Sequence, residues 1–379
     1  MAELVTSPVN PMETSQFADR RTRLLEPLQT LGADALLVTH LPNVRYLTGF
    51  SGTAGILVLE SGGEAALVTD SRYLSQSREE IGELEICKVI ESYDETLVRY
   101  ARTRAYRSLA YEEAYCRVSR LRFLESGLSE DTRLLGCQGW IESLRAVKDG
   151  GELERLERAA RGLGPTLHSL KEEIRPGVSE RTVAAELDYR LRQNGYEKTA
   201  FETIVASGPR AALPHGRPTD RRFELGDLVI IDFGGVIDGY SSDVTRTFCV
   251  GEPWPEAERI YEVVRAAQQA AIESVRPGIE AQEVDRAARD VIESAGLGEF
   301  FGHGTGHGIG LEVHESPWIS PGRVERLETG MVFTVEPGIY IPGKGGVRLE
   351  DDVLVTEGGC RLLSRGEKEL QGISWVCYV

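Results

Sequence analysis

The chain has 379 residues, of which 41% are hydrophobic and 27% charged, as is usual for a soluble globular protein with room for two domains. Its formal net charge of −17 at pH 7 argues against nucleic acid and anionic membranes as partners, because both repel an acidic surface. No apolar run approaches the roughly 20 residues needed to span a bilayer, and the N-terminus has neither the basic start nor the apolar core of a secretion signal.

The first part of the chain predicts a small α/β domain. Residues 1–16 are expected to form a disordered lead. An amphipathic helix then precedes a buried strand at Ala35–Val38. Further strands are expected at residues 55–60, 63–70 and 85–90, and helices at 97–106 and 115–128. Because helices and strands alternate, residues 17–148 are interpreted as one α/β domain.

A turn at residues 148–152 marks the predicted domain boundary, so that the second domain covers residues 149–379. Glu152 opens a long charged helix there. Further helices are expected at 182–195, 257–275 and 281–296, and strand pairs within 228–250, 331–341 and 347–356. The tripeptide RPG occurs at 175–177 and again at 276–278, each time between two helices, which hints at an internal duplication. The expected fold class is α/β (α+β).

Two acidic residues interrupt apolar strands of the second domain. Asp232 follows four apolar residues in LVIIDFGG, where an unpaired carboxylate would be costly. Asp243 lies in YSSDVTRTF, and a hairpin with its turn at residues 237–239 would join the two segments. If Asp232 lies opposite Asp243 or Thr245, both carboxylates are on one face. Such a pair shares a proton or a cation; the alternative is a purely structural dyad, protonated or paired with arginine.

The last predicted hairpin has a similar feature. Glu336 lies in VFTVEPGIYI and Glu350 in GVRLEDDVLV. Simple alternation across the PGKG turn would pair Glu336 with Asp351 and turn Glu350 to the other face. A bulge at residues 337–338 would correct this. The register alone therefore leaves open which acid joins Glu336.

The segment GHGTGHGIGLEVHE, residues 302–315, contains His303, His307 and His314 and almost no bulky side chain. Glycine in such numbers predicts close approach to the backbone, and the imidazoles could supply nitrogen ligands or proton donors. Several carboxylates and an imidazole in one domain suit a hard or borderline divalent ion such as manganese, cobalt or zinc. Bridging carboxylates favour two such ions, which together can activate water and polarise a carbonyl. The pattern indicates hydrolytic chemistry.

The order Asp232, Asp243, His307, Glu336 and Glu350 resembles the ligand set of the pita-bread metallopeptidases, which include the methionine aminopeptidases, aminopeptidase P and prolidase. The segments ALPHG, IDFGG, SDVTRTF, GHGTGHGIGLEVHE, VEPGIY and VRLEDD resemble those of the proline-specific branch. The likeness covers nearly the whole chain. The second domain resembles the pita-bread catalytic domain, and the first resembles the creatinase-type N-terminal domain through LPNVRYLTGFSGTAG.

The resemblance implies a role for each residue of the site. Asp232 would bind one metal ion, Asp243 and Glu350 would bridge both, and His307 and Glu336 would hold the second. Glu336 would also carry a proton to the leaving prolyl nitrogen. His303 and His314 would flank the scissile carbonyl and bind the substrate, His215 would close the substrate pocket, and Arg348 would orient a carboxylate.

One position departs from the family pattern. In prolidases the residue after HE-x-P is usually an arginine that grips the free carboxylate of a dipeptide, whereas HESPWIS has Trp318. From this difference we predict an Xaa-Pro aminopeptidase, with an Xaa-Pro dipeptidase (prolidase) as the alternative. A catalytically dead pita-bread module that binds peptides is the non-enzyme alternative, and the complete ligand set argues against it and against the metal-free creatinase branch.

The resemblance also implies cofactors and partners. It implies two divalent metal ions, with manganese as the first choice, proline-containing peptides as substrates, and a homodimer or tetramer. The six cysteines are scattered and form no C-x-x-C pair, so free thiols in a reducing compartment are expected. We therefore expect a cytoplasmic enzyme with neither nucleic acid nor membrane as a partner.

Overall fold

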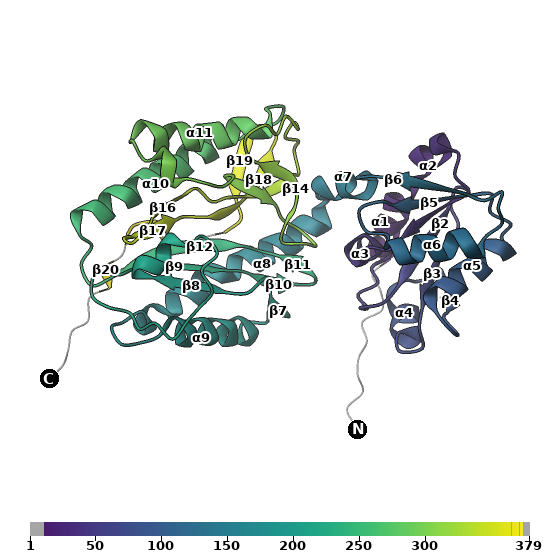
Figure 1. Ribbon diagram of the computed structural model, residues 1–379, viewed down its shortest axis with the longest axis horizontal. Coiled ribbons are helices and arrows are strands. Elements are labelled where there is room, and N and C mark those ends of the chain that lie inside the picture. The colour runs from purple at the N-terminus through teal and green to yellow at the C-terminus, as the bar shows by residue number, and fades with distance from the viewer. Residues whose placement is uncertain (1–10, 365, 371, 374–379) are drawn as a thin grey trace, which may run out of the picture. The chain divides into compact units, whose positions relative to one another are not determined.

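The computed structural model describes residues 11–364, 366–370 and 372–373. The chain divides into two compact units between Leu144 and Arg145, close to the boundary expected at residues 148–149 (Figure 1). The predicted α/β class is confirmed. None of the helices in the described part of the chain combines the length and the apolar character that crossing a bilayer requires.

The first unit is built on a six-stranded sheet with the order β4-β3-β2-β1-β5-β6. Its strands are β1 (Ala35–Val38), β2 (Ile56–Glu60), β3 (Ala65–Thr69), β4 (Glu85–Lys88), β5 (Ser108–Glu112) and β6 (Arg133–Cys137). Its helices are α1 (Pro11–Thr22), α2 (Leu25–Leu31), α3 (Leu41–Thr48), α4 (Leu74–Glu80), α5 (Tyr93–Thr103) and α6 (Val118–Gly127), and α7 (Trp140–Ala146) crosses into the second unit. Every residue of the central strand β1 is buried, as its unbroken apolar run predicts.

The start of this unit differs from the prediction. Residues 1–10 of the expected disordered lead lie outside the described residues, but residues 11–16 belong to α1. The helix is anchored because Arg20 and Arg21 donate hydrogen bonds to the carbonyl oxygens of Tyr46 and Leu47 in α3, at 2.9 and 2.7 Å. The single predicted helix is also divided into α1 and α2, since Pro27 is tolerated only in the first turn of a helix.

The second unit begins where Asp149 caps α8, with Glu152 completing a reciprocal capping box. Its helices are α8 (Gly150–Ser169), α9 (Glu180–Gln193), α10 (Pro255–Ser274) and α11 (Ala281–Ser294). Its strands are β7 (Lys198–Thr199), β8 (Ile204–Ser207), β9 (Leu228–Phe233), β10 (Gly235–Ile237), β11 (Tyr240–Ser241), β12 (Val244–Val250), β13 (Gly306–Gly308), β14 (Glu315–Ile319), β15 (Val332–Val335), β16 (Gly338–Ile341), β17 (Gly345–Arg348), β18 (Asp351–Thr356), β19 (Gly359–Leu362) and β20 (Gly372–Ile373). The larger sheets have the orders β20-β12-β9-β8 and β14-β13-β15-β18-β19.

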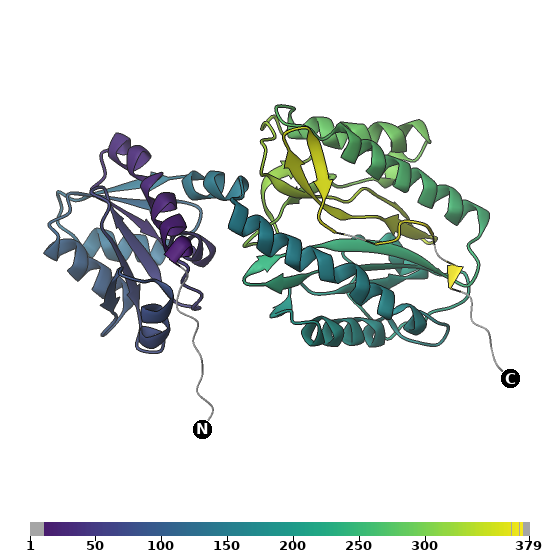
Figure 2. The same ribbon diagram turned by 180° about the vertical axis from the view of Figure 1, so that it is seen from behind.

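The helices of this unit lie on two sides of its sheets (Figures 1 and 2). On one side, Val264 of α10 and Val284 of α11 share a core with Phe333 of β15. On the other side, Leu163 of α8 and Leu187 of α9 share a second core with strands β9 and β12. The sheets between these cores carry the predicted site residues and hold them on rigid backbone.

The two halves of the second unit repeat one arrangement. Helices α8 and α10 each have 20 residues, α9 and α11 each have 14, and an RPG turn follows the first helix of each pair. The residue before α9 forms an antiparallel bridge with Arg222, and the residue before α11 forms the equivalent bridge with Arg326. Each pair of helices is followed by a strand pair, β9–β12 or β15–β18. These matches support the internal duplication suggested by the sequence.

Candidate metal centre

The five predicted ligands come from both halves of the second unit. Asp232 is in β9, Asp243 immediately precedes β12, and His307 is in β13. Glu336 follows β15 and Glu350 precedes β18. All five line one cavity of about 290 Å³, which His215, His314 and Arg348 also line. Eight of the nine predicted site residues are therefore brought together, and His303 is the exception.

The predicted hairpin of β9 and β12 is confirmed. Thr245 lies opposite Asp232, which is one of the two registers expected from the sequence. Asp243, two residues before Thr245, therefore lies diagonally across from Asp232 on the same face of the sheet.

The predicted register of the last hairpin is wrong. Val335 pairs with Asp351, and Gly338 pairs with Arg348. Each strand has two residues between these two pairs, so the register is the same on both sides of Glu336. Glu336 therefore lies opposite Glu350 without any bulge. The error arose at the turn, where Ile341 pairs with Gly345 and only three residues form the loop.

Three of these side chains form the tightest group. Ligand atoms of Asp243, His307 and Glu350 all lie within 4.8 Å of one another. His307 Nε2 lies 3.5 Å from Glu336 Oε1 and 4.0 Å from Asp243 Oδ2. His307 Nδ1 donates to the carbonyl oxygen of Gly308 at 3.1 Å, so Nε2 presents its lone pair to the carboxylates. Burial, and then the neighbouring His314, lower the pKa of His307 to about 4, which keeps the imidazole neutral and able to bind a metal ion.

The carboxylates of the cavity lack the positive charge that their burial requires. Burial and then the neighbouring Glu350 raise the pKa of Asp243 well above its ordinary value, and burial and then Glu336 do the same for Glu350. The pKa of Glu336 rises to about 8, chiefly through burial. Asp232 Oδ1 and Asp243 Oδ1 are buried without a hydrogen-bond partner. Unsatisfied carboxylate oxygens beside a neutral imidazole fit divalent cations.

Arg348 is a buried guanidinium that contacts a carboxylate of this group directly. Its Nη2 atom donates to Asp232 Oδ2 at 2.5 Å, and its Nε atom donates to Thr245 Oγ1 at 3.1 Å. Thr245 Oγ1 in turn donates to Glu350 Oε2 at 2.6 Å. Arg348 thus contacts one carboxylate directly and a second one through the hydroxyl group of Thr245.

Sequence reasoning missed Tyr340, which connects Arg348 to His303. Arg348 Nη1 donates to the Tyr340 hydroxyl at 2.8 Å, and this hydroxyl lies 2.9 Å from His303 Nε2. His303 Nδ1 donates to the carbonyl oxygen of Gly304 at 2.7 Å, so Nε2 accepts the hydrogen of the tyrosine. Both ring nitrogens of His303 are thus bonded to protein atoms, and its expected contact with a substrate stays a prediction.

His215 and His314 are solvent-exposed and line the cavity, as a substrate-binding role requires. The ring centroid of His314 lies 4.3 Å from that of His307, and its ring stacks on the half-exposed indole of Trp318. Trp318 therefore orients His314 and does not line the cavity itself.

The glycines of residues 302–315 serve the sheet. A Cβ atom on Gly306 would lie 1.8 Å from the carbonyl oxygen of Thr334 in β15, and one on Gly308 would lie 2.2 Å from that of Ser316 in β14. Strand β13 therefore lies between the closely spaced strands β14 and β15, and its glycines allow His307 to reach the cavity. The close approach to the backbone that these glycines predict is thus made by the neighbouring strands.

Comparison with known proteins agrees with this geometry. Residues 154–357 match the family described as Metallopeptidase family M24, and residues 20–147 match the Creatinase/Prolidase N-terminal domain. An Xaa-Pro dipeptidase of Pyrococcus horikoshii is 39% identical over 350 residues, which cover 92% of this chain and 97% of the relative.

Solved structures show the same similarity. An Xaa-Pro dipeptidase from Bacillus anthracis has a TM-score of 0.90 at 37% identity, covering 93% of this chain and 99% of that chain. An X-Pro aminopeptidase from Thermotoga maritima has a TM-score of 0.85 at 36% identity, with the same coverage of both chains.

Proposed function

The chain belongs to metallopeptidase family M24, and from this premise we propose that it is a two-metal peptidase that hydrolyses the bond preceding proline, with Xaa-Pro dipeptides as its preferred substrates. The observation that carries the proposal is the buried group of Asp243, His307 and Glu350, whose ligand atoms lie within 4.8 Å of one another and in which Asp243 Oδ1 has no hydrogen-bond partner. The complete ligand set argues against a binding module without activity.

The preference for dipeptides replaces the aminopeptidase predicted from Trp318. A curated relative and a solved structure with full-length similarity are both named Xaa-Pro dipeptidases, and the similar aminopeptidase structure has a lower TM-score. The prolidase alternative is therefore better supported than the main prediction.

Asp232, Asp243, His307, Glu336 and Glu350 would hold the two metal ions. Divalent ions bound there supply two kinds of chemistry: they polarise the scissile carbonyl, and they lower the pKa of water. Manganese is the first choice because most of the ligands are carboxylate oxygens.

The remaining steps belong to side chains of the chain itself. When the bond before proline breaks, the prolyl nitrogen leaves and must gain a proton. Glu336 would deliver it, because its carboxyl group lies in the cavity beside the other proposed ligands. His314 and His215 would donate hydrogen bonds to the substrate, and the apolar side chains of Phe201, Ile204 and Val313 offer a surface for the pyrrolidine ring.

We also propose a cytoplasmic homodimer. Cys87, Cys116, Cys137, Cys249 and Cys360 are free thiols in the described part of the chain, which supports a reducing compartment. Size-exclusion chromatography with light scattering would measure the oligomeric state.

The proposed function is tested by a peptidase assay on the purified protein. An Xaa-Pro dipeptide and the corresponding Xaa-Pro-Xaa tripeptide are compared with added manganese, with and without a chelator. Faster cleavage of the dipeptide, lost on chelation and absent in Asp243→Asn, is expected. A preference for the tripeptide would restore the aminopeptidase prediction, and binding of manganese without cleavage of either peptide would favour the binding module.

A further inference from the structure

The cavity has one positively charged group that is available to a ligand. Besides the four acidic metal ligands, it is lined by Glu202 and by two guanidinium groups, Arg217 and Arg348. Arg348 is buried, and each of its three nitrogens already donates to a protein oxygen: Nε to Thr245, Nη1 to Pro214 and Tyr340, and Nη2 to Asp232. A dipeptide brings a free carboxylate into this cavity, and Arg348, which already donates to these protein oxygens, is not available to pair with it.

Arg217 lies at the solvent-facing edge of the cavity. Its side chain is 80% exposed, and its Nε atom forms an ion pair of 3.0 Å with Glu202 Oε2, whose side chain is 62% exposed. Within residues 11–364, 366–370 and 372–373, its Nη1 and Nη2 atoms make no further hydrogen bond or ion pair. Two parallel N–H donors are therefore free, which is the geometry that binds a carboxylate through both oxygens.

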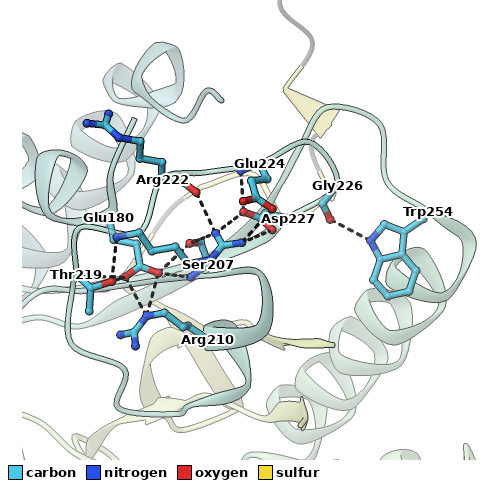
Figure 3. Close-up of polar contacts among 10 residues, drawn as sticks. Glu180, Ser207, Arg210, Thr219, Arg222, Glu224, Gly226, Asp227 and Trp254 are labelled. Carbon is cyan, nitrogen blue, oxygen red and sulfur yellow. Dashed lines mark hydrogen bonds and ion pairs between the residues drawn. The ribbon is translucent and has the colours of Figure 1, made fainter. Parts of the chain in front are cut away.

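The loop that carries Arg217 is held firmly in place. Glu180 of α9 is fully buried, and its Oε1 atom accepts hydrogen bonds of 2.8 Å from both the backbone nitrogen and the hydroxyl of Ser207, before the loop (Figure 3). Its Oε2 atom accepts from the backbone nitrogen and the hydroxyl of Thr219, after the loop, at 2.9 and 2.7 Å.

Arg210 completes this clamp. Its Nε atom donates to Glu180 Oε2 at 3.1 Å, and its Nη2 atom donates to the carbonyl oxygen of Arg217 at 2.6 Å. One buried carboxylate thus closes both ends of the loop and, through Arg210, fixes the backbone of Arg217. A side chain on a fixed backbone loses less freedom when it binds a ligand.

We infer, on the basis of the proposed function, that Arg217 binds the C-terminal carboxylate of an Xaa-Pro dipeptide and so determines the specificity for dipeptides. Glu202 holds the guanidinium near the cavity in the free enzyme and exchanges with the substrate carboxylate. Trp318, at the position where prolidases usually have an arginine, has no charge and cannot form this ion pair. With Arg217 in that role, the presence of Trp318 is compatible with a dipeptidase.

The test compares substrates that differ only in this carboxylate. The manganese-supplemented enzyme is assayed with an Xaa-Pro dipeptide and with its C-terminal amide. In Arg217→Ala, the ratio of kcat/KM for the dipeptide to that for the amide is expected to fall by about 10-fold, equivalent to about 1.4 kcal/mol. Arg217→Lys should lose less, because it keeps the charge but not the paired donors. Glu202→Gln should lower the KM for the dipeptide by about twofold, because a competing carboxylate is removed.

A matched control lies next to the clamp residue Thr219, whose carbonyl oxygen accepts from the backbone nitrogen of Arg181. Arg181 pairs with Asp220 at 3.3 Å, with side chains 65% and 85% exposed, and it does not line the cavity. Arg181→Ala therefore removes an equivalent surface ion pair and should leave the ratio at the wild-type value. Calorimetry with proline and prolinamide provides a readout independent of turnover: only the binding of proline should weaken in Arg217→Ala.

The outcomes separate the assignment of Arg217 from the proposed function. If the wild-type enzyme cleaves no Xaa-Pro substrate, the proposed function fails and the role of Arg217 fails with it. If the wild type cleaves the dipeptide but Arg217→Ala and Arg181→Ala give equal ratios, only the role of Arg217 is overturned.

Discussion

Replacing Glu336 by glutamine should stabilise the metal-free protein while it abolishes peptidase activity. In the absence of metal ions, burial raises the pKa of Glu336 to about 8 from 4.5. The folded state then holds a proton that the unfolded state releases, so the stability of the wild type falls as pH rises from about 4.5 to about 8. Glutamine has nearly the same shape and does not ionise, so this loss is absent in Glu336→Gln.

The size of the effect follows from the pKa. Each pKa unit corresponds to about 1.4 kcal/mol, so the uptake of this proton on folding lowers the stability by about 3 kcal/mol at pH 7 and by less than about 1 kcal/mol at pH 5. In a unit of this size, 1 kcal/mol shifts Tm by about 2 to 4 °C. Thermal unfolding of the chelator-treated proteins should therefore show a Tm advantage of Glu336→Gln that is small at pH 5 and increases by several degrees towards pH 8.

Asp351 provides the contrasting control. Burial raises its pKa, but Arg246 and Lys368, at 2.8 and 2.6 Å, more than offset this effect, and the pKa is lowered overall. Asp351→Asn breaks buried ion pairs and should destabilise the protein with or without metal ions, by about 3 kcal/mol or more. A Tm advantage of Glu336→Gln that does not change with pH, or a loss of Tm at pH 8, would refute the electrostatic account of the cavity.

Three further predictions concern the backbone, the loop clamp and the metal ions. Gly306→Ala places a Cβ atom 1.8 Å from the carbonyl oxygen of Thr334 and should lower both Tm and manganese affinity, whereas Gly302→Ala, with no atom within 4 Å, should change neither. Glu180→Gln should speed hydrogen exchange of residues 208–219 and raise the KM for dipeptides, because the loop between Ser207 and Thr219 loses its charged clamp; unchanged exchange would contradict the clamp. Manganese at 100 times its Kd should stabilise the wild type by about 2.7 kcal/mol in thermal unfolding, and an equal gain in Asp243→Asn would contradict its role as a ligand.

The part of the site that could be predicted from the sequence is where an acidic residue lies in an apolar strand. Asp232 in a fully buried strand is costly unless it has a partner, so its presence alone indicates a site. The turn at residues 237–239 then limits the register enough to place Asp243 on the same face. The family resemblance supplied the remaining ligands.

What could not be predicted depends on turn length and on side-chain contacts. A three-residue loop in place of a four-residue one moves Glu350 from the wrong face to the position opposite Glu336. The same register would have identified Tyr340: it pairs with Gly346, so strand alternation places it on the same face as Arg348, two residues further on. Strand β13 was missed because glycine and histidine are poor strand formers, and its pairing is set by its neighbours.

In the segment LEDD the fold separates the proposed metal ligand Glu350 from the two acidic residues that follow it. Asp351 is turned towards Arg246 and Lys368 and is fully paired. Asp352 Oδ2 accepts a hydrogen bond of 3.2 Å from the backbone nitrogen of Asp243 and thus holds that ligand in place. Glu350, on the opposite face from Asp351, accepts from the neutral hydroxyl of Thr245.

Arg246 and Lys368 thus pair with Asp351 and do not line the cavity. Among the described residues, Arg348 is the only buried cation that lines it. With all four carboxylates ionised, as metal binding requires, they and one guanidinium carry a charge of about minus three, which two divalent ions would convert to plus one. A single excess positive charge favours the negative charge that develops on the substrate carbonyl oxygen during hydrolysis. Removing Arg348 would cancel that excess, so Arg348→Met should lower kcat even where both metal ions remain bound. Metal analysis of the variant alongside its kinetics would separate this effect from loss of the ions, and an unchanged kcat with both ions present would contradict it.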